Sequence, residues 1–229
     1  MTTTSTAKPT AIAYLKERLS AAVLAPIRAF RPAYLPLLMV YFAYGALGLT
    51  AIADSFWVKK ELTLTPAQLA QLGVWITLPW TIKMVFGELV DCVPIFGSQR
   101  RVYITIGALF TASGLVTLAG AAGGWLTFLR PDQLYVLGAL LMVLGTVIQD
   151  VVADAMSTEV VSRVDASGAP KPENEVRSEL GMVQVIGRLS LSAGIVAVAG
   201  LSGVLASIFD RETVFLIGLV IPANRNWPS

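Results

Sequence analysis

Ionisable and polar side chains lie inside long apolar segments of this sequence. An ionised side chain at the centre of a bilayer costs about 2.5–3.5 kcal/mol on insertion scales, so those that persist usually have partners or functions. Asp150 and Asp154 are four residues apart and share one face of a helix. Tyr41 and Tyr44, one turn apart, would offer a stacking surface to a ligand, although packing between helices is the simpler explanation. The charged and amide candidates are Lys83, Gln149, Asp150, Asp154, Gln184 and Arg188.

These charges have two interpretations. Asp150 and Asp154 lie near the end of one apolar segment and Arg188 in the first turns of the next, so Arg188 would bridge a carboxylate bidentately. In the first interpretation they line a central cavity, where Lys83 and Arg188 attract an anionic substrate. In the second, the charges only pair with each other to hold the helices together, or lie among the lipid headgroups.

The composition indicates a membrane protein and excludes several classes of function. Of 229 residues, 55% are hydrophobic and 14% are charged, whereas a typical soluble domain has about 25% charged residues. There is no histidine and one cysteine, Cys92, which excludes an intrachain disulfide and the Ser-His and Cys-His pairs of hydrolases. A net charge of +2 is too small to indicate nucleic acid as a partner. We expect neither an enzyme nor a bound cofactor or metal.

Apolar segments recur along the chain at about the 20-residue length that spans a bilayer. We predict an all-α polytopic membrane protein with five complete spans and a truncated sixth. The loop over 157–179 is polar and has the composition of a solvated linker. The predicted spans cover residues 34–53, 71–90, 102–122, 133–156 and 180–209, followed by a partial span over 213–222 and a short tail over 223–229.

The basic residues predict the orientation of these spans. Residues 1–33 form a basic tail in which 11–30 has the pattern of an amphipathic helix on the membrane surface, with a partly ordered tail as the alternative. Of the 17 Lys and Arg residues, eleven flank the side of the N-terminus and four the other side. Because cytoplasmic loops are enriched in Lys and Arg, we predict a cytoplasmic N-terminus and a location in the cytoplasmic (inner or plasma) membrane.

The end of the second predicted span and the loop after it carry the most specific motif. Asp91, Pro94 and Gly97 would shape a tight reversal, and Arg100 and Arg101 would begin the third span beside lipid phosphate. In chain order, the members of the motif are Trp80, Lys83, Gly87, Asp91, Pro94, Gly97, Arg100 and Arg101.

This motif resembles the loop between helices two and three of the major facilitator superfamily and, more closely, of its folate-biopterin transporter family. Met84 stands where that family usually has proline after the lysine, and the rest of the spacing matches. The segment over 149–155 is also similar to the family's fourth helix. The resemblance implies the N-terminal six-helix bundle of a transporter that works by alternating access. It also implies that Asp91 and Arg101 form a conformational latch.

Two functions from different classes fit these features. The resemblance implies secondary transport of a small organic anion that is folate- or pterin-like. Asp150 or Asp154 would then carry a coupled proton or bind the pterin-like ring. The alternative is a half-transporter scaffold that acts as an assembly or structural subunit of a membrane complex. Membrane lipid is a partner in both cases, and a missing C-terminal half or a partner chain would complete a transporter.

Overall fold

The described chain is a bundle of long helices. The computed structural model describes residues 24–223 apart from 27, 61, 63, 96, 98, 99 and 166. No β-sheet occurs among these residues, which confirms the predicted all-α class. Most of the predicted surface helix over 11–30 and of the tail over 223–229 lies outside the described residues. The elements are η1 (Pro32–Tyr34), α2 (Leu35–Ala46), η2 (Leu47–Thr50), α3 (Ala51–Lys60), α4 (Pro66–Thr81), α5 (Lys83–Cys92), α6 (Arg101–Ala122), α7 (Pro131–Glu159), α8 (Glu173–Ile208), α9 (Arg211–Gly218) and α10 (Val220–Ala223).

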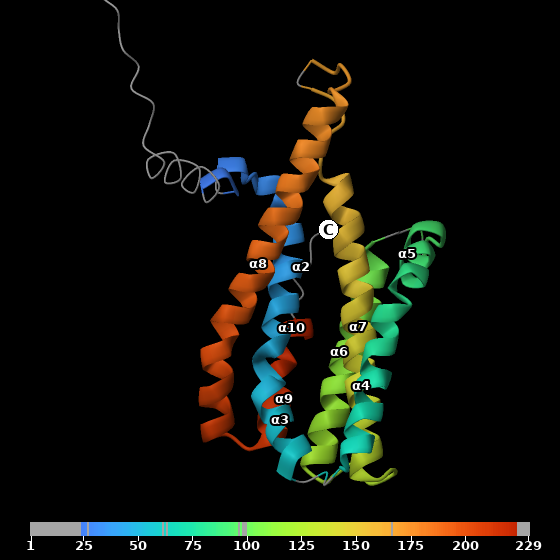
Figure 1. Cartoon of the computed structure of the whole chain (residues 1–229), viewed down its shortest axis with the longest axis vertical. Helices are drawn as coiled ribbons and strands as arrows, with labels where there is room; N and C mark the ends of the chain where they lie inside the picture. Colours follow the sequence, from blue (N-terminus) through green and yellow to red (C-terminus); the bar gives the residue numbers. More distant parts are fainter. Residues whose placement is uncertain are drawn as a thin grey trace, which may run out of the picture.

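Five helical stretches among the described residues are long and apolar enough to cross a membrane, which confirms the predicted polytopic protein. They alternate in direction (Figure 1), so that the start of α2, the ends of α5 and α7 and the starts of α6 and α8 meet at one end of the bundle. We call this end the N-terminal face, and the end where α4 and α7 begin the opposite face. The stretches are Pro32–Lys59, Pro66–Cys92, Arg101–Ala122, Pro131–Glu159 and Glu173–Ile208.

The fifth span is longer than its apolar segment and shortens the polar loop. α8 begins at Glu173 instead of at residue 180, and α7 continues to Glu159 instead of ending at residue 156. Glu173 and Glu175 lie in the first turn of α8, where acidic side chains interact favourably with the helix dipole. Arg177 pairs with Glu173 at 2.6 Å, one turn along the helix. Local charge interactions therefore extend the helix beyond the segment that hydropathy detects.

The first span continues through Asp54, where the predicted span ends. α2 passes through η2 into α3, and the region of η2 packs against α8. A Cβ on Gly45 would meet the backbone carbonyl of Leu191, and one on Gly194 would meet the carbonyl of Phe42. Glycine at both positions is what allows the two backbones to approach this closely.

The second span is broken beside Lys83. α4 ends at Thr81 and α5 begins at Lys83, with Ile82 between them at φ −96° and ψ 14°. Pro79 lies in the turn before the break, where its missing N–H weakens the helix. The break places Lys83 at the first residue of α5.

Glycines also bring α6 and α7 into close contact. A Cβ on Gly107 would lie 2.9 Å from the carbonyl oxygen of Gly145, and one on Gly114 would lie 2.6 Å from that of Gly138. Small residues at these four positions allow the backbones to approach. α7, the helix that carries the predicted aspartates, is thereby fixed against α6.

Candidate functional site

An ammonium group bridges two carboxylates inside the bundle. Lys83 Nζ donates to Asp150 Oδ2 at 2.5 Å and to Asp154 Oδ2 at 2.7 Å. The side chain of Asp150 is 3% exposed, whereas those of Lys83 and Asp154 are 29% and 35% exposed. The four-residue spacing of the aspartates directs both carboxylates from α7 towards the start of α5.

Tyr41 extends this arrangement to α2 and α8. Its hydroxyl donates to Asp154 Oδ1 at 2.9 Å, and the residue is 1% exposed. The guanidinium carbon of Arg188 lies 5.8 Å from the centre of the Tyr41 ring, which is a cation–π geometry. Gly187 makes room for the ring, because a Cβ there would lie 2.7 Å from it. We call the following residues the central cluster: Tyr41, Lys83, Asp150, Asp154 and Arg188.

The predicted ion pair between Arg188 and the aspartates is not formed. Lys83 contacts both carboxylates instead, and Arg188 reaches the cluster through the ring of Tyr41. The reason is the break in the second span, which directs Lys83 towards α7. Tyr41, for which packing was the simpler expectation, is instead a hydrogen-bonding member of the cluster.

Two predicted amides lie beside the cluster without contacting its charged groups. Gln149 is 5% exposed and packs against Gly107 of α6. Gln184 Nε2 donates to Ser157 Oγ at 2.5 Å, and Ser157 donates to the backbone carbonyl of Asp154 at 2.6 Å. Gln184 therefore supports the end of α7 from α8.

An aromatic pair and a shallow cavity adjoin the same region. Tyr44 stacks on Trp80 of α4, with ring centres 6.2 Å apart and 24° between the planes. A cavity of about 370 Å³ on α8 is lined by polar residues of the stripe predicted on the fifth span, Gln184, Arg188 and Ser192, and by Val185 and Leu189. Arg188 thus lies at an open cavity.

The central cluster is balanced in charge but not in hydrogen bonds. Its two carboxylates are matched by the ammonium of Lys83 and the guanidinium of Arg188. Asp150 Oδ1, however, is buried and has no hydrogen-bond partner among the residues that the structure describes. A buried oxygen without a donor costs about 1–3 kcal/mol, so this atom is a place where a ligand donor would bind favourably.

Arg100, and not Arg101, forms the ion pairs of the loop motif at the N-terminal face. Arg100 contacts Asp91 of α5 at 2.8 Å and Glu159 at the end of α7 at 2.5 Å. The hydrogen bond to Glu159, reinforced by the one to Asp91, raises the pKa of the Arg100 guanidinium above its usual value. Arg101 is exposed in the first turn of α6 and does not form the predicted pair with Asp91.

The other members of the loop motif shape the turn. Gly97 has φ 76°, a left-handed conformation that favours glycine. A Cβ on Gly87 would lie 4.0 Å from Val151, so α5 and α7 are neighbours at that point. The Tyr103 hydroxyl donates to two backbone carbonyls at the end of α5, at 3.1 and 2.8 Å. Pro94 is exposed.

Three residues of these interactions are not predicted from the sequence. Ser157 and Glu159 fall in the segment assigned to the polar loop, so nothing indicated that they would face a helix. Trp80 stands in the quoted motif one turn before Lys83, and its position is the signal that could have placed it near the cluster.

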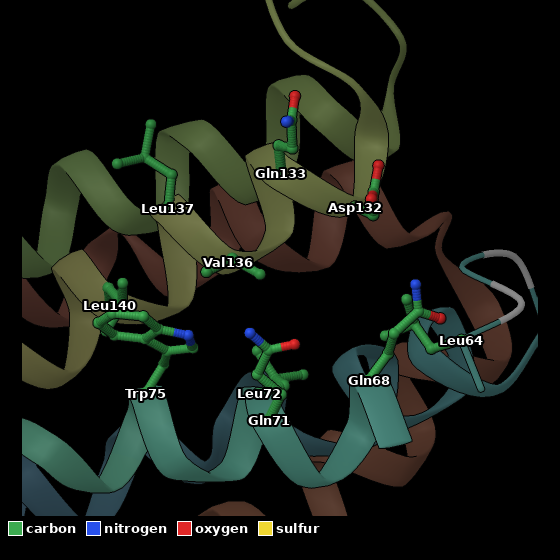
Figure 2. A pocket seen from close by; sticks show the side chains of 10 residues that line it. All are labelled: Leu64, Gln68, Gln71, Leu72, Trp75, Asp132, Gln133, Val136, Leu137 and Leu140. Atoms are coloured by element: carbon green, nitrogen blue, oxygen red, sulfur yellow. The ribbon is translucent and has the colours of Figure 1, made fainter. Parts of the chain in front are cut away.

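A second cavity lies at the opposite face. It is a groove of about 550 Å³ between the first turns of α4 and α7. Figure 2 shows Trp75 and Leu140 towards one end, and Gln68 and Asp132 towards the other. The groove is therefore apolar at one end and polar at the other. Its lining is Leu64, Gln68, Gln71, Leu72, Trp75, Asp132, Gln133, Val136, Leu137 and Leu140.

The helical bundle and its interior charges define a polytopic membrane protein of the class that contains solute transporters. The chain belongs to the BT1 family, whose sequence model matches residues 45–223. This result confirms the family resemblance.

The chain is similar to proteins named as transporters in cyanobacteria, plants and a protozoan. It is 32% identical over 193 residues, 82% of its length, to the "Folate-biopterin transporter" of Synechocystis sp.. It is 30% identical over 197 residues, 85% of its length, to the "Probable folate-biopterin transporter 4" of Arabidopsis thaliana. It is 25% identical over 169 residues, 73% of its length, to the "Folate transporter 1" of Plasmodium falciparum. These are names of transporters and not of enzymes, which confirms the expected class.

The matched region covers only part of each relative. The alignments span 34% of the Synechocystis protein, 37% of the Arabidopsis protein and 30% of the Plasmodium protein. The chain therefore spans about a third of the length of these relatives. No solved structure matches it significantly.

Proposed function

We propose that this protein is part of a secondary transporter that moves a folate- or pterin-like organic anion across the membrane by alternating access, with coupling to protons. The bridge of Lys83 between Asp150 and Asp154 carries the proposal, because ionisable groups inside a helical bundle mark substrate and proton pathways. The names of the relatives suggest the substrate class.

An anionic substrate would compete with the two aspartates for the same cation. When a substrate carboxylate binds Lys83, the ammonium group gives up one of its two partners. The released carboxylate of Asp150 or Asp154 then lies in a low-dielectric environment without a cation, which favours its protonated form. Substrate binding and proton binding therefore support each other, as coupled transport requires.

The neighbouring residues offer further contacts to such a substrate. Arg188 lies at the cavity of about 370 Å³, where its guanidinium is placed to bind a second carboxylate bidentately. Tyr44 and Trp80 form a stacked aromatic pair that would pack against a pterin-like ring. Together they surround the anion with two cations and an aromatic surface.

Two sparsely covered spans would face the rest of a transporter. In the most apolar window of each span, 11% of the residues of α8 and 12% of those of α4–α5 are buried, against 50% in α6 and in α7. We propose that a second bundle, present in the longer relatives or in a partner chain, packs on these spans and closes the cavity. Arg100, Asp91 and Glu159 would form the latch at the N-terminal face, which the basic residues predict to be cytoplasmic.

Uptake of radiolabelled folate into proteoliposomes tests the substrate and the role of the central cluster. We expect Lys83→Met to lower the rate about tenfold or more, because loss of one charge-assisted contact is worth at least about 1.4 kcal/mol. Lys59→Met, at an exposed lysine of α3, is the matched control and is expected to retain uptake.

Lys83→Met leaves two aspartates without their cation, which risks misfolding. The double variant Lys83→Met with Asp150→Asn is therefore measured alongside, because it also removes one of the two carboxylates. If a monodisperse double variant transports folate at the wild-type rate, the central cluster does not bind substrate. If proteoliposomes that contain the chain together with its second bundle take up no folate or pterin, the proposed transport function is wrong.

The alternative function is an assembly subunit of a membrane complex, which the exposed apolar faces of α8 and α4–α5 also favour. A transporter needs a second bundle to be active, whereas an assembly subunit needs the other proteins of its complex. Purification from the native membrane in mild detergent, followed by mass measurement of the intact particle and its chains, distinguishes them. A stoichiometric complex with unrelated proteins and no folate uptake would support the subunit.

A further inference from the structure

The first and fourth spans carry the same two residue types in the same order and exchange hydrogen bonds. Tyr41 of the first span donates to Asp154 of the fourth at 2.9 Å. Tyr135 of the fourth span donates to Asp54 of the first at 3.2 Å. Each span therefore supplies the tyrosine of one pair and the aspartate of the other.

The antiparallel course of these spans places the two pairs at different depths. The first span runs from the N-terminal face towards the opposite face, and α7 runs back (Figure 1). Thirteen residues separate Tyr41 from Asp54, which is about 20 Å along a helix at 1.5 Å per residue. The arrangement has the character of an inverted repeat about an axis in the membrane plane, in which a group on one side has a counterpart on the other.

Whereas Asp154 is paired with Lys83, the partner that the structure shows for Asp54 is the hydroxyl of Tyr135. The donor Tyr135 lies among aromatic side chains: the Trp57 ring meets the Tyr135 ring edge-on, with centres 5.3 Å apart, and the ring of the buried Phe215 of α9 lies 5.9 Å from that of Trp57. α4, α6, α8 and η2 bring no ionisable side chain to this level of the bundle. An ionisable side chain within a membrane span that is held by a neutral hydroxyl marks a candidate functional site.

Charged groups also lie on the remaining neighbouring elements. Among the described side chains these are Lys59 on α3, Asp132 on α7, and Arg211 and Glu212 on α9. Asp132 pairs with Arg130 at 3.1 Å, and Glu212 accepts a hydrogen bond from the indole of Trp125 at 2.9 Å. The hydroxyl of Tyr135 is the hydrogen-bond partner that the structure gives to the Asp54 carboxylate.

The groove at the opposite face adjoins the apolar cluster that contains Tyr135. Leu72 lines the groove and also packs in the apolar cluster with Trp57 and Tyr135. Figure 2 shows Leu72 on α4 facing Val136 of α7, the residue after Tyr135. Leu72 thus belongs both to the wall of the groove and to the apolar cluster that contains Tyr135, the hydrogen-bond donor to Asp54.

We propose that Asp54, hydrogen-bonded to Tyr135, is a proton-binding site near the opposite face, reached from that side through the groove between α4 and α7. The carboxylate takes up one proton and becomes neutral, and it releases that proton when the site opens to the N-terminal face. This inference rests on the proposed transport function and adds a second carboxyl group to the proton pathway, at the other end of the spans from the central cluster.

Two measurements on the protein in proteoliposomes test the site. The first is infrared difference spectroscopy of the protonated carboxyl C=O band at neutral pH. We expect Asp54→Asn to remove a band that the wild type shows, and Tyr135→Phe to keep the band but shift it, because the hydrogen bond to the carboxyl group is lost. Asp132→Asn, a carboxylate of the same face that already has a cation, is the matched control and is expected to leave the band unchanged.

The second measurement compares folate exchange at equal pH with folate accumulation driven by a pH gradient. We expect Asp54→Asn to abolish accumulation and to retain exchange within about twofold of the wild type, because a neutral amide mimics the protonated state. An unchanged carboxyl band in Asp54→Asn, or unchanged accumulation, would overturn the proton site. Absence of folate exchange by the wild-type chain together with its second bundle would instead overturn the proposed transport function, and the infrared band would still report on Asp54.

Discussion

A single tyrosine connects three spans at the scale of the residue. Tyr41 belongs to α2, donates its hydroxyl to a carboxylate of α7 and presents its ring to a guanidinium of α8. The two interactions use different parts of the side chain, so substitution can separate them. This separation allows the hydrogen bond and the cation–π contact to be weighed independently.

We expect Tyr41→Phe to lower the stability of the bundle by about 1.5–3 kcal/mol, the usual value of a hydrogen bond to a charged group. The ring under Arg188 remains, so the cation–π contact persists. Tyr41→Ala removes both interactions and also leaves a cavity, so its loss is expected to be larger. Thermal unfolding in detergent is monitored by the loss of the monodisperse peak in size-exclusion chromatography. We expect stability to decrease in the order wild type, Tyr41→Phe, Tyr41→Ala. Equal stability of Tyr41→Phe and wild type would mean that Asp154 does not depend on this donor.

At the scale of the element, the sequence predicts the spans better than the partners of the charged residues. Hydropathy finds the apolar segments because burial in lipid is a property of composition. It misses the continuation of the first span through Asp54, because the hydroxyl that satisfies this carboxylate comes from α7, far away in the sequence.

The same limit applies to the central cluster. The spacing of Asp150 and Asp154 correctly predicts a shared face, since that depends on helix geometry alone. Their partner depends on the break at Ile82, which turns Lys83 towards α7, and no local pattern gives the direction of a break. The choice of Arg100 over Arg101 likewise depends on the end of α7, which extends to Glu159.

Glycine contacts between helices give a prediction at this scale. A Cβ on Gly194 would meet the carbonyl of Phe42, whereas Gly200, further along α8, has nothing within 4 Å of such an atom. We expect Gly194→Ala to destabilise the bundle by about 1–3 kcal/mol through overpacking. Gly200→Ala is the matched control and is expected to be neutral or to stabilise α8 by up to about 1 kcal/mol, because alanine is the better helix former. The same chromatographic unfolding assay compares them, and a Gly194→Ala variant as stable as Gly200→Ala would show that α2 and α8 are not held at this distance.

At the scale of the whole molecule, the charged residues divide between the two ends of the bundle. Near the opposite face the described side chains include Lys59, Arg130 and Arg211. Near the N-terminal face the basic residues are Arg28, Arg31, Arg100, Arg101, Arg163, Lys171 and Arg177. Because short cytoplasmic loops are enriched in Lys and Arg, this asymmetry supports the prediction that the N-terminal face is cytoplasmic.

The cysteine at the N-terminal face tests this orientation directly. Cys92 is the one cysteine of the sequence, ends α5 and is exposed, so no residue has to be introduced. We expect a membrane-impermeant maleimide to label it in inside-out vesicles and to leave it unlabelled in right-side-out vesicles. A permeant maleimide should label Cys92 in both preparations, which controls for access. The Cys92→Ser variant should be labelled in neither preparation, which controls for other nucleophiles. The opposite labelling pattern would place the N-terminal face outside. The Asp54 site would then face the cytoplasm, and protons would enter the proposed pathway at the central cluster.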